Sequence, residues 1–233
     1  MSLKQPLDLT ALRAKVLTSL LRMPLFLGLL VFLPAWSFDY WQAWLYIAIF
    51  SASVSAVTLA TLRHDPALMA RRLAVGAAAE PERSQQIIQG ITGALSCAIF
   101  IAAGGEHRWH GVSVPWPAVL GAHVVLMLGL LVVYKVFQAN SYTAATVQVE
   151  SNQTVADSGP YAWVRHPMYS GSVLGYLATP LALGSLAALV PAILVCAMIV
   201  VRLLDEERYL SANLPGYREY QNRVTFRLIP FVW

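Results

Sequence analysis

The feature that most constrains this chain is a series of long apolar stretches separated by polar segments. Four of them, at 16–36, 41–62, 87–103 and 116–137, have about the 17–25 residues that a helix needs to cross a bilayer. A further run, from Ser172 to Val201, has no charged side chain. Soluble domains carry about 25% charged residues, whereas this chain carries 12%. The pattern therefore predicts an all-α integral membrane protein.

The last apolar run, Met168 to Val201, is too long for one ordinary span and short for two. Pro180, Gly184 and Pro191 interrupt it, which predicts a helical hairpin over 168–201 with two arms of about 15 residues, each about 23 Å long. Arms of that length are shorter than the ~30 Å hydrocarbon core, so we expect the tip to be buried against other helices. With the hairpin, the chain has five to six transmembrane segments.

The lysines and arginines predict how these segments are oriented. If the N-terminus, the 63–83 loop, the 138–167 loop and the tail share one side, that side holds all of them except Arg108. Basic residues concentrate on the cytoplasmic side of membrane proteins. We therefore expect both termini and any site at the hairpin base to be cytoplasmic. The compact chain, without eukaryotic sorting signals, favours a bacterial inner membrane.

Two regions follow from this pattern: a four-span membrane region at 1–137, and a core at 138–233 that contains the cytoplasmic loop, the hairpin and the tail. Several classes of site are disfavoured. The sequence has neither a Rossmann nor a P-loop glycine motif, and His107 and His110 have no further metal ligand nearby. The net charge of +4 is explained by basic residues that flank spans, so we expect no nucleic-acid partner.

Polar clusters occupy both ends of the hairpin. At the first end, Pro167 suits the first turn of a helix, where backbone N–H groups can hold an anion such as a carboxylate. Tyr161 and Tyr169 add flat faces that can stack on a base or lie near a cation. At the second end, Arg202 and Glu206 are four residues apart and share one helix face. There, Glu206 can pair with a ligand ammonium and Arg202 can hold a carboxylate.

Each of these features has a simpler explanation when taken alone. The arginine and histidine before Pro167 are also typical of interfacial residues at the start of a span, and the acidic run at 205–207 of a solvated helix end. The argument for a site depends on their combination, because a hairpin returns the chain to the surface that it left. We therefore expect the two clusters to meet.

At these residues the sequence resembles the isoprenylcysteine carboxyl methyltransferase family, within the wider superfamily that includes phospholipid methyltransferases. The family pattern is R-H-P-x-Y-x-G, then an apolar hairpin, then E-E. Here it stands at 165–171 and at Glu206-Glu207, with further matches at 159–161, 216–220 and Ile229-Pro230. The resemblance covers about 147–233.

The resemblance implies an S-adenosylmethionine pocket on the cytoplasmic side, open to the bilayer. It also implies an arginine on the substrate side, which falls on Arg202, and a lipophilic small-molecule or lipidated acceptor drawn from the membrane. The cofactor contacts that carry over are Gln148, Gln153, Thr154, Val155, Ala156, Tyr161, His166, Pro167, Met168, Tyr169 and Glu206.

The chemistry of this family needs neither a general base nor a metal when the acceptor is a carboxylate. A sulfonium methyl is already activated, and a carboxylate is deprotonated at neutral pH. The protein must then align the reacting atoms and exclude water. Because a cationic Arg202 suits an anionic acceptor better than an amine, the sequence favours an isoprenylcysteine-type carboxylate.

Three alternatives stay open. The same scaffold is compatible with a phospholipid, amine or thiol methyltransferase. A sterol-type membrane reductase also has several membrane spans, but it requires NADPH. A non-catalytic membrane scaffold or transporter is the third alternative. Transporters often show a charged pair within their spans or an internal repeat, and this sequence has no charged pair within the spans and no obvious repeat.

Overall fold

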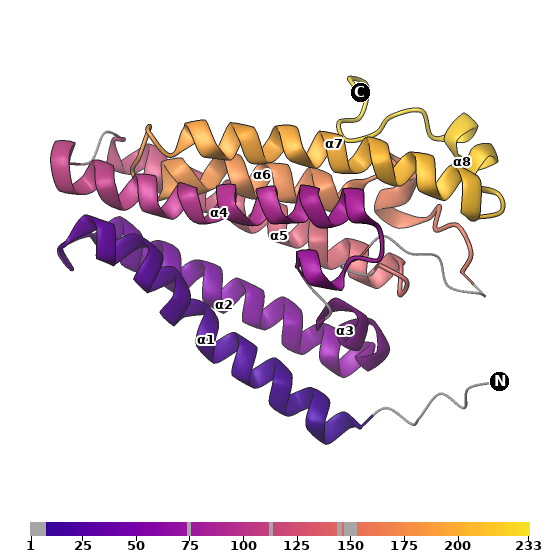
Figure 1. Cartoon of the computed structure of the whole chain (residues 1–233), viewed down its shortest axis with the longest axis horizontal. Coiled ribbons are helices and arrows are strands. Elements are labelled where there is room, and N and C mark those ends of the chain that lie inside the picture. Colours follow the sequence, from indigo (N-terminus) through magenta and orange to yellow (C-terminus); the bar gives the residue numbers. More distant parts are fainter. Residues whose placement is uncertain (1–7, 74–75, 112–113, 144–145, 147–152) are drawn as a thin grey trace.

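The computed structural model describes residues 8–73, 76–111, 114–143, 146 and 153–233. Within these residues the secondary structure is entirely helical, which confirms the predicted all-α class (Figure 1). The elements are α1 (Leu9–Ala35), α2 (Trp41–His64), α3 (Pro66–Leu73), the 3-10 turn η1 (Ala77–Ala79), α4 (Arg83–His110), α5 (Trp116–Ala139), the 3-10 turn η2 (Gly159–Ala162), α6 (Pro167–Ala182), α7 (Leu189–Asn213) and α8 (Tyr217–Arg223).

The long helices run back and forth along the longest axis of the molecule, so that their connections gather at two ends. One end carries α3, α8 and the first turn of α1 (Figure 1), and we call it the terminal end. At the opposite end lie the connection from α1 to α2, the end of α4 and the turn between α6 and α7. Tyr40 Oη donates to Leu183 O at 2.5 Å there, and Ala187 N donates to a Glu106 oxygen at 2.9 Å.

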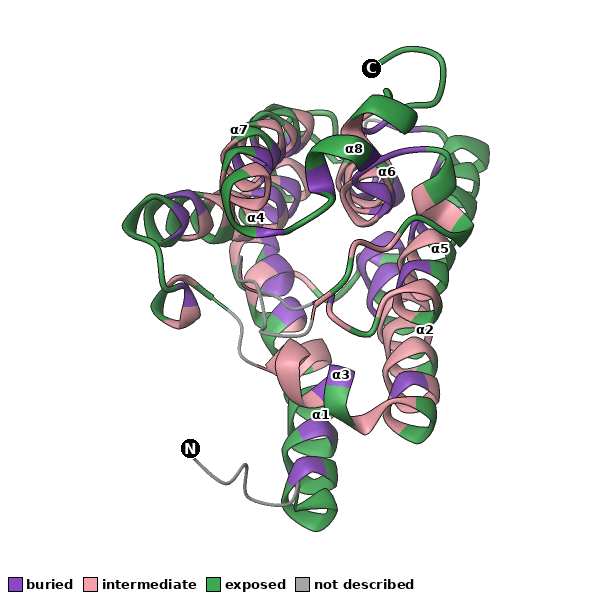
Figure 2. Cartoon of the chain, turned by 90° about the vertical axis from the view of Figure 1, so that its right-hand side faces the viewer, coloured by how far each residue is buried: buried purple, intermediate pink, exposed green. Residues whose placement is uncertain are grey.

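In the part of the chain that the structure describes, four helices are long and apolar enough to cross a membrane: α1, α2, α4 and α5. They expose large apolar side chains, such as the row of Leu21, Leu25, Leu29 and Leu33 on α1, and Figure 2 shows much of α1 in the colour of exposed residues. Spacing of four residues places these leucines on one helix face, as a lipid-facing stripe requires. Five tryptophans are exposed at the opposite end, as an interfacial belt requires: Trp36, Trp41, Trp44, Trp109 and Trp116.

The predicted hairpin is formed by α6 and α7, joined by the turn at 183–188. Its first arm has 16 residues, close to the expected length. Its second arm has 25, because the helix does not stop at the end of the apolar run but continues through 202–213. The tip is partly buried: Leu183 and Ala188 have no exposed surface, whereas Leu186 is 49% exposed. Whether the hairpin crosses the bilayer, and hence the total number of spans, stays a prediction.

Two segments that the sequence assigned to loops are helical. The 63–83 segment contains α3 and η1, and α3 is started by Asp65, whose carboxylate accepts from Leu68 N at 2.8 Å. The expected loop after residue 103 is shorter than predicted because α4 continues to His110. Both segments are polar at the membrane boundary, where a helix no longer needs apolar side chains to persist.

Helices α5 and α6 approach each other closely through two glycines. A Cβ atom added to Gly129 would lie 2.6 Å from Gly171 O, and one added to Gly171 would lie 2.6 Å from Gly129 O. The two backbones approach so closely only because both positions lack a side chain. This contact fixes the first turns of α6, which carry the Arg-His-Pro motif, against α5.

Candidate active site at the base of the hairpin

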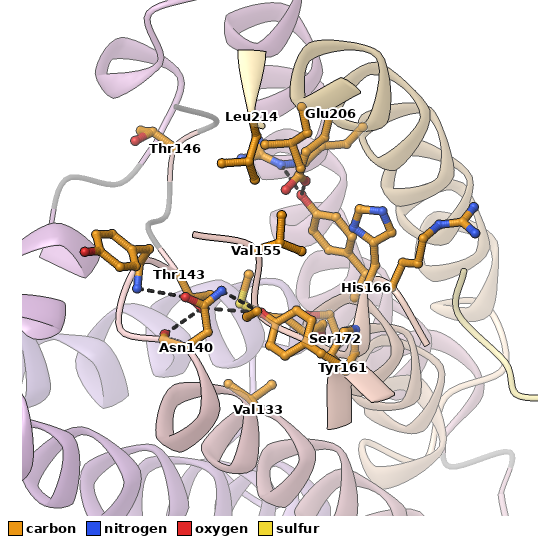
Figure 3. A pocket seen from close by; sticks show the side chains of 18 of the residues that line it. Val133, Asn140, Thr143, Thr146, Val155, Tyr161, His166, Ser172, Glu206 and Leu214 are labelled. Atoms are coloured by element: carbon orange, nitrogen blue, oxygen red, sulfur yellow. Dashed lines mark hydrogen bonds between the residues drawn. The ribbon is translucent and has the colours of Figure 1, made fainter. Parts of the chain in front are cut away.

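A cavity of about 370 Å³ lies at the terminal end, between the base of the hairpin, α5 and the segment 153–161 (Figure 3). This volume is within the range typical of small-molecule sites. Every described residue that the sequence predicted for the site lines it: Gln153, Thr154, Val155, Ala156, Tyr161, His166, Pro167, Met168, Tyr169, Arg202 and Glu206. Gln148 lies outside the described residues.

Tyr169 links the two ends of the hairpin. Its hydroxyl donates to Glu206 Oε2 at 2.5 Å and accepts from Arg202 Nε at 2.9 Å. The two α7 residues lie on the face that their spacing predicted, and Tyr169 reaches them from the first turn of α6. The prediction that the two polar clusters meet is confirmed, and the result is a carboxylate, a phenol and a guanidinium on one wall of the cavity.

Glu80 is a member of this site that the sequence did not indicate. Its carboxylate Oε1 lies 2.7 Å from Arg202 Nη2, and its side chain is completely buried. A carboxylate without solvent contact needs a charged or hydrogen-bonding partner, and Arg202 supplies one. The guanidinium that was predicted to face a substrate carboxylate is therefore already neutralised by a carboxylate of the protein.

Glu207 forms a second cluster behind the cavity. Its carboxylate accepts from Arg165 Nε at 2.7 Å and Arg227 Nε at 3.0 Å, and lies 3.3 Å from His166 Nε2. Burial opposes ionisation of this carboxyl, but the hydrogen bonds from His166, Arg165 and Arg227 outweigh burial and lower its pKa to about 2. Glu207 thus stays ionised and holds both residues before Pro167 against α7.

The C-terminal segment completes the base of the hairpin. Arg165 N donates to Phe226 O at 2.9 Å, and His166 N donates to Arg227 O at 3.0 Å. The sequence predicted that free N–H groups at the start of this helix can hold an anion. The N–H groups of Arg165 and His166, which precede α6, are used by the tail, and Pro167 has none. The N–H groups that remain for an anion are those that follow Pro167 in the first turn of α6.

Tyr161 forms the other side of the cavity. Its hydroxyl lies 3.3 Å from Asn140 Nδ2 and 3.4 Å from Thr143 Oγ1, both just after α5 (Figure 3). Its carbonyl accepts from Tyr220 Oη of α8 at 2.8 Å. Burial raises the pKa of the Tyr161 phenol, so it stays protonated. The ring is held from both ends and presents a fixed aromatic face.

Other cavity residues were missed because they lie in segments that the sequence assigned to loops or lipid-facing spans. Arg72 belongs to α3. The sequence showed only that it is a basic residue on the same side of the membrane as the motif. Thr92 and Tyr176 are polar residues within apolar helices, which is the signal that was available for them. The full set outside the motif also includes Gln89, Val133, Asn140, Tyr142, Thr143, Thr146, Ser172, Ile199, Leu210, Leu214, Tyr217 and Tyr220.

Two histidines outside the motif, His107 and His123, do not line the cavity. His107 lies in the last turns of α4 at the opposite end, stacked on Tyr40 with ring centroids 3.9 Å apart. His123 is buried in α5 and bonds the Val119 carbonyl at 2.8 Å. No group of three or more potential metal ligands occurs in the described part of the chain.

Comparison with known proteins now gives these residues a context. Residues 117–215 match the model of the family described as phospholipid methyltransferase. The matched segment includes the Arg-His-Pro motif, Arg202 and Glu206. The resemblance to the superfamily of isoprenylcysteine and phospholipid methyltransferases, drawn from the motif, is therefore confirmed.

The chain is also similar to the cobalt-zinc-cadmium resistance protein CzcN of Cupriavidus metallidurans. The two sequences are 31% identical over 120 residues, which cover 51% of this chain and 52% of that protein. The chain thus spans about half the length of the curated relative it matches.

The phospholipid methyltransferase segment contains α5 from its second residue, η2, α6 and α7. It supplies Tyr161, the Arg-His-Pro motif, Arg202 and Glu206. Arg72 and Glu80 come from the region before it. The site is therefore built from the family segment together with polar residues of the preceding 63–83 region.

Proposed function

We propose that this protein is an integral membrane methyltransferase that uses S-adenosylmethionine and acts on a lipophilic acceptor, with a carboxylate of isoprenylcysteine type as the first candidate. The observation that carries the proposal is the single cavity in which the family motif converges, with Glu206 and Tyr169 on one wall and Tyr161 on the other. The matched family segment supports methyl transfer as the reaction class.

The cavity residues suit the chemical groups of S-adenosylmethionine. Glu206 offers a carboxylate for an ammonium group, and Tyr161 offers an aromatic face for a base. The first turn of α6 offers backbone N–H groups for a carboxylate. When bound, the cofactor supplies a methyl carbon on sulfonium, so that a new bond from the acceptor oxygen to this carbon forms as the carbon–sulfur bond breaks and its electron pair passes to sulfur.

The chain's own residues then have the task of positioning. Tyr169 fixes the Glu206 carboxylate through its hydroxyl, and Arg202 fixes Tyr169 in turn. A carboxylate acceptor is ionised at neutral pH and requires no base from the protein. Alignment of acceptor and methyl carbon, with water excluded by the apolar wall of the cavity, is the source of rate acceleration that this site offers.

A phospholipid or amine acceptor on the same scaffold is the second candidate, and the matched family is described as phospholipid methyltransferase. Because Glu80 neutralises Arg202, that arginine no longer argues against an amine. An amine must lose a proton before it attacks, so this reaction requires a proton acceptor that a carboxylate substrate does not. A panel with one carboxylate, one amine and one thiol acceptor separates these candidates by the product formed.

We also propose that the terminal end of the molecule faces the cytoplasm. Fifteen of the 16 lysines and arginines belong to segments assigned to that side, and positive charge concentrates on the cytoplasmic side of bacterial inner membranes. Accessibility labelling of a cysteine introduced in place of Glu219, which is exposed on α8, tests this orientation in intact cells. Labelling from outside the cell contradicts it.

The first test of the function is calorimetric titration of detergent-purified protein with S-adenosylmethionine and S-adenosylhomocysteine. We expect micromolar binding by the wild type and at least tenfold weaker binding by Glu206→Ala, since an ion pair with the ligand ammonium is lost. NADPH, titrated in parallel, tests the reductase alternative. Folded protein that binds NADPH but neither sulfur compound contradicts the proposal.

Asp205→Ala is the matched control. Asp205 is the neighbour of Glu206 on α7, but its carboxylate accepts from Ser84 Oγ at 2.9 Å and Gln85 Nε2 at 2.6 Å, and it does not line the cavity. We expect its loss to leave cofactor binding within about twofold. Equal weakening by both variants attributes the effect to the end of α7 in general, and a scaffold or transporter role predicts no effect of either.

A further inference from the structure

The segment after α8, residues 224–233, returns along the outside of the hairpin. Figure 1 shows the chain passing from α8 back toward the middle of the long helices before it ends. Seen along the helices from the terminal end, this segment lies at the outer edge of the bundle, beyond α6 (Figure 2). It therefore lies on the flank of the helices, which is the surface that a bilayer surrounds.

Hydrogen bonds fix the position of this segment along the hairpin. Ser170, in the first turn of α6, donates from Oγ to Leu228 O at 2.6 Å. Just before it, the N–H groups of Arg165 and His166 donate to carbonyls of the same segment. The segment is thus attached where the polar base of the hairpin passes into its apolar arm, a boundary that is typical of the membrane interface.

The final residues, 228–233, form a closed turn that uses its own backbone groups. The N–H groups of Leu228 and Ile229 donate to Trp233 O at 2.8 and 3.0 Å. Those of Val232 and Trp233 both donate to Ile229 O at 3.1 Å, and the proline in the turn has no N–H group. A turn that satisfies its own N–H groups enters an apolar medium at less cost than one that relies on water.

The side chains of this turn are apolar and exposed. Phe231 is 79% exposed and Val232 is 73% exposed, and Ile229 beside them is also exposed. In the part of the chain that the structure describes, Phe231 is the most exposed of the large apolar side chains. Contiguous exposed apolar residues of this kind mark a surface that binds a protein or a membrane.

A bilayer interface suits the composition and the place of this turn better than a soluble partner does. The Arg227 guanidinium carbon lies 5.2 Å from the centre of the Trp233 ring. Arginine and tryptophan side chains beside apolar ones are typical of the headgroup level of a bilayer. A soluble partner would have to bind on the flank of the helices, where lipid competes for the same surface.

The same arginine connects the turn to the base of the hairpin. Arg227 Nε donates to Glu207 Oε2 at 3.0 Å, and Glu207 also accepts from Arg165 Nε. The backbone carbonyl of Arg227 accepts from His166 N. Whatever holds the turn in place therefore also holds two residues of the Arg-His-Pro motif.

We propose that residues 228–233 are a membrane anchor, which inserts Phe231 and Val232 into the boundary between lipid headgroups and acyl chains. The partner is the bilayer itself, and the contact holds the segment 224–227 against the Arg-His-Pro motif. The anchor lies outside the matched family segment at 117–215. It requires neither a cofactor nor a methyl acceptor, so it does not rest on the proposed function.

The first test measures the depth of the turn in a bilayer. The protein, with Cys97 and Cys196 replaced by alanine, receives a single nitroxide-labelled cysteine at Phe231 or Val232. It is placed in nanodiscs of phosphatidylethanolamine and phosphatidylglycerol. We expect the label to collide more often with oxygen, which concentrates in the acyl region, than with a water-soluble nickel chelate.

Two further labelled positions calibrate this measurement. A label at Leu25, on the exposed face of α1, should show the oxygen preference of a lipid-facing site. A label at Glu219, exposed on the polar helix α8, should show the nickel preference of a site in water. Labels at Phe231 and Val232 that behave as the one at Glu219 overturn the anchor, and the turn is then a surface for a soluble partner.

The second test measures the link to the motif by hydrogen–deuterium exchange in the same nanodiscs. Phe231→Ser combined with Val232→Ser should speed exchange in the peptide 163–171 about tenfold, which corresponds to about 1.4 kcal/mol of protection. Both side chains are exposed in the protein itself, so their replacement has this effect only if lipid contacts them. Phe231→Leu, which keeps an apolar side chain, should exchange as the wild type does.

Phe38→Ser is the matched control, because Phe38 is an equally exposed aromatic residue at the opposite end of the molecule. It should leave exchange in the peptide 163–171 unchanged. If the double variant exchanges as slowly as the wild type, or if Phe38→Ser speeds exchange equally, the link between the turn and the motif is refuted. Unfolding midpoints of all variants are measured alongside, so that a global loss of structure is recognised.

Discussion

Arg202 of α7 and Glu80, which follows η1, form a buried ion pair with 2.7 Å between Nη2 and Oε1. The same guanidinium donates through Nε to Tyr169 Oη, which in turn donates to Glu206. The 63–83 region is thereby connected through one arginine to the residues of the family motif. The consequence is that a segment outside the motif stabilises the geometry within it.

The ion pair predicts a large effect of neutralising Glu80. Glu80→Gln removes the carboxylate that forms the ion pair with the buried Arg202 guanidinium, and breaking a buried pair on one side costs about 3–5 kcal/mol. We expect a clear fall in the midpoint of thermal unfolding in detergent. Glu82→Gln, two residues on and exposed to solvent, should change the midpoint little. Equal midpoints for the two variants would show that the pair contributes no stability.

The Tyr169 hydroxyl predicts an effect on the cofactor. Tyr169→Phe removes the hydroxyl that donates to Glu206 and accepts from Arg202, but it retains the ring. We expect S-adenosylmethionine to bind about tenfold more weakly by calorimetry, because Glu206 loses the group that orients it. Tyr209→Phe, on α7 but outside the cavity lining, is the matched control. Unchanged binding by Tyr169→Phe contradicts an orienting role.

Glu207 predicts how stability depends on pH. Its folded-state pKa, about 2, is below its usual 4.5, so its stabilising contribution is complete above pH 4.5 and is lost as the pH falls through the range toward 2. The shift corresponds to at most about 3 kcal/mol. We expect Glu207→Gln to be less stable at pH 7 and to lose less stability upon acidification, as measured by unfolding at a series of pH values.

Glu219→Gln is the control for that series, since Glu219 is exposed on α8. It should reproduce the acid sensitivity of the wild type. If Glu207→Gln keeps the full acid sensitivity, carboxyl groups other than Glu207 are responsible for it.

The contact of α5 with α6 predicts that one methyl group is not tolerated there. Gly129→Ala places a Cβ 2.6 Å from Gly171 O, and overpacking of this kind typically costs about 1–3 kcal/mol. Gly121→Ala, on the same helix with no atom within 4 Å of the added Cβ, should be neutral or slightly stabilising. The comparison is made by unfolding midpoint and by cofactor titration, because α6 carries Met168 and Tyr169. Equal effects of both substitutions would attribute the change to helix propensity alone.

Much of the architecture could be predicted from the apolar pattern. Four long apolar stretches became α1, α2, α4 and α5, and the uncharged run with Pro180 and Gly184 became a hairpin. Where the prediction failed, at the polar 63–83 segment and at 104–110, the signal for a helix was not apolar character but local hydrogen bonding, such as the Asp65 cap of α3. The spacing of apolar residues does not predict such helices.

The sequence by itself determined the helical class, the return of the chain at the hairpin and the residues at its base, because apolar length, prolines and the Arg-His-Pro motif are local signals. Only the tertiary structure decided the partners. It pairs Arg202 with Glu80 and brings Glu207 into contact with Arg165, His166 and Arg227. It also places Arg72 in the lining of two cavities. These contacts join residues from separate helices, and nothing in the local sequence states which buried charges will face each other once the helices pack.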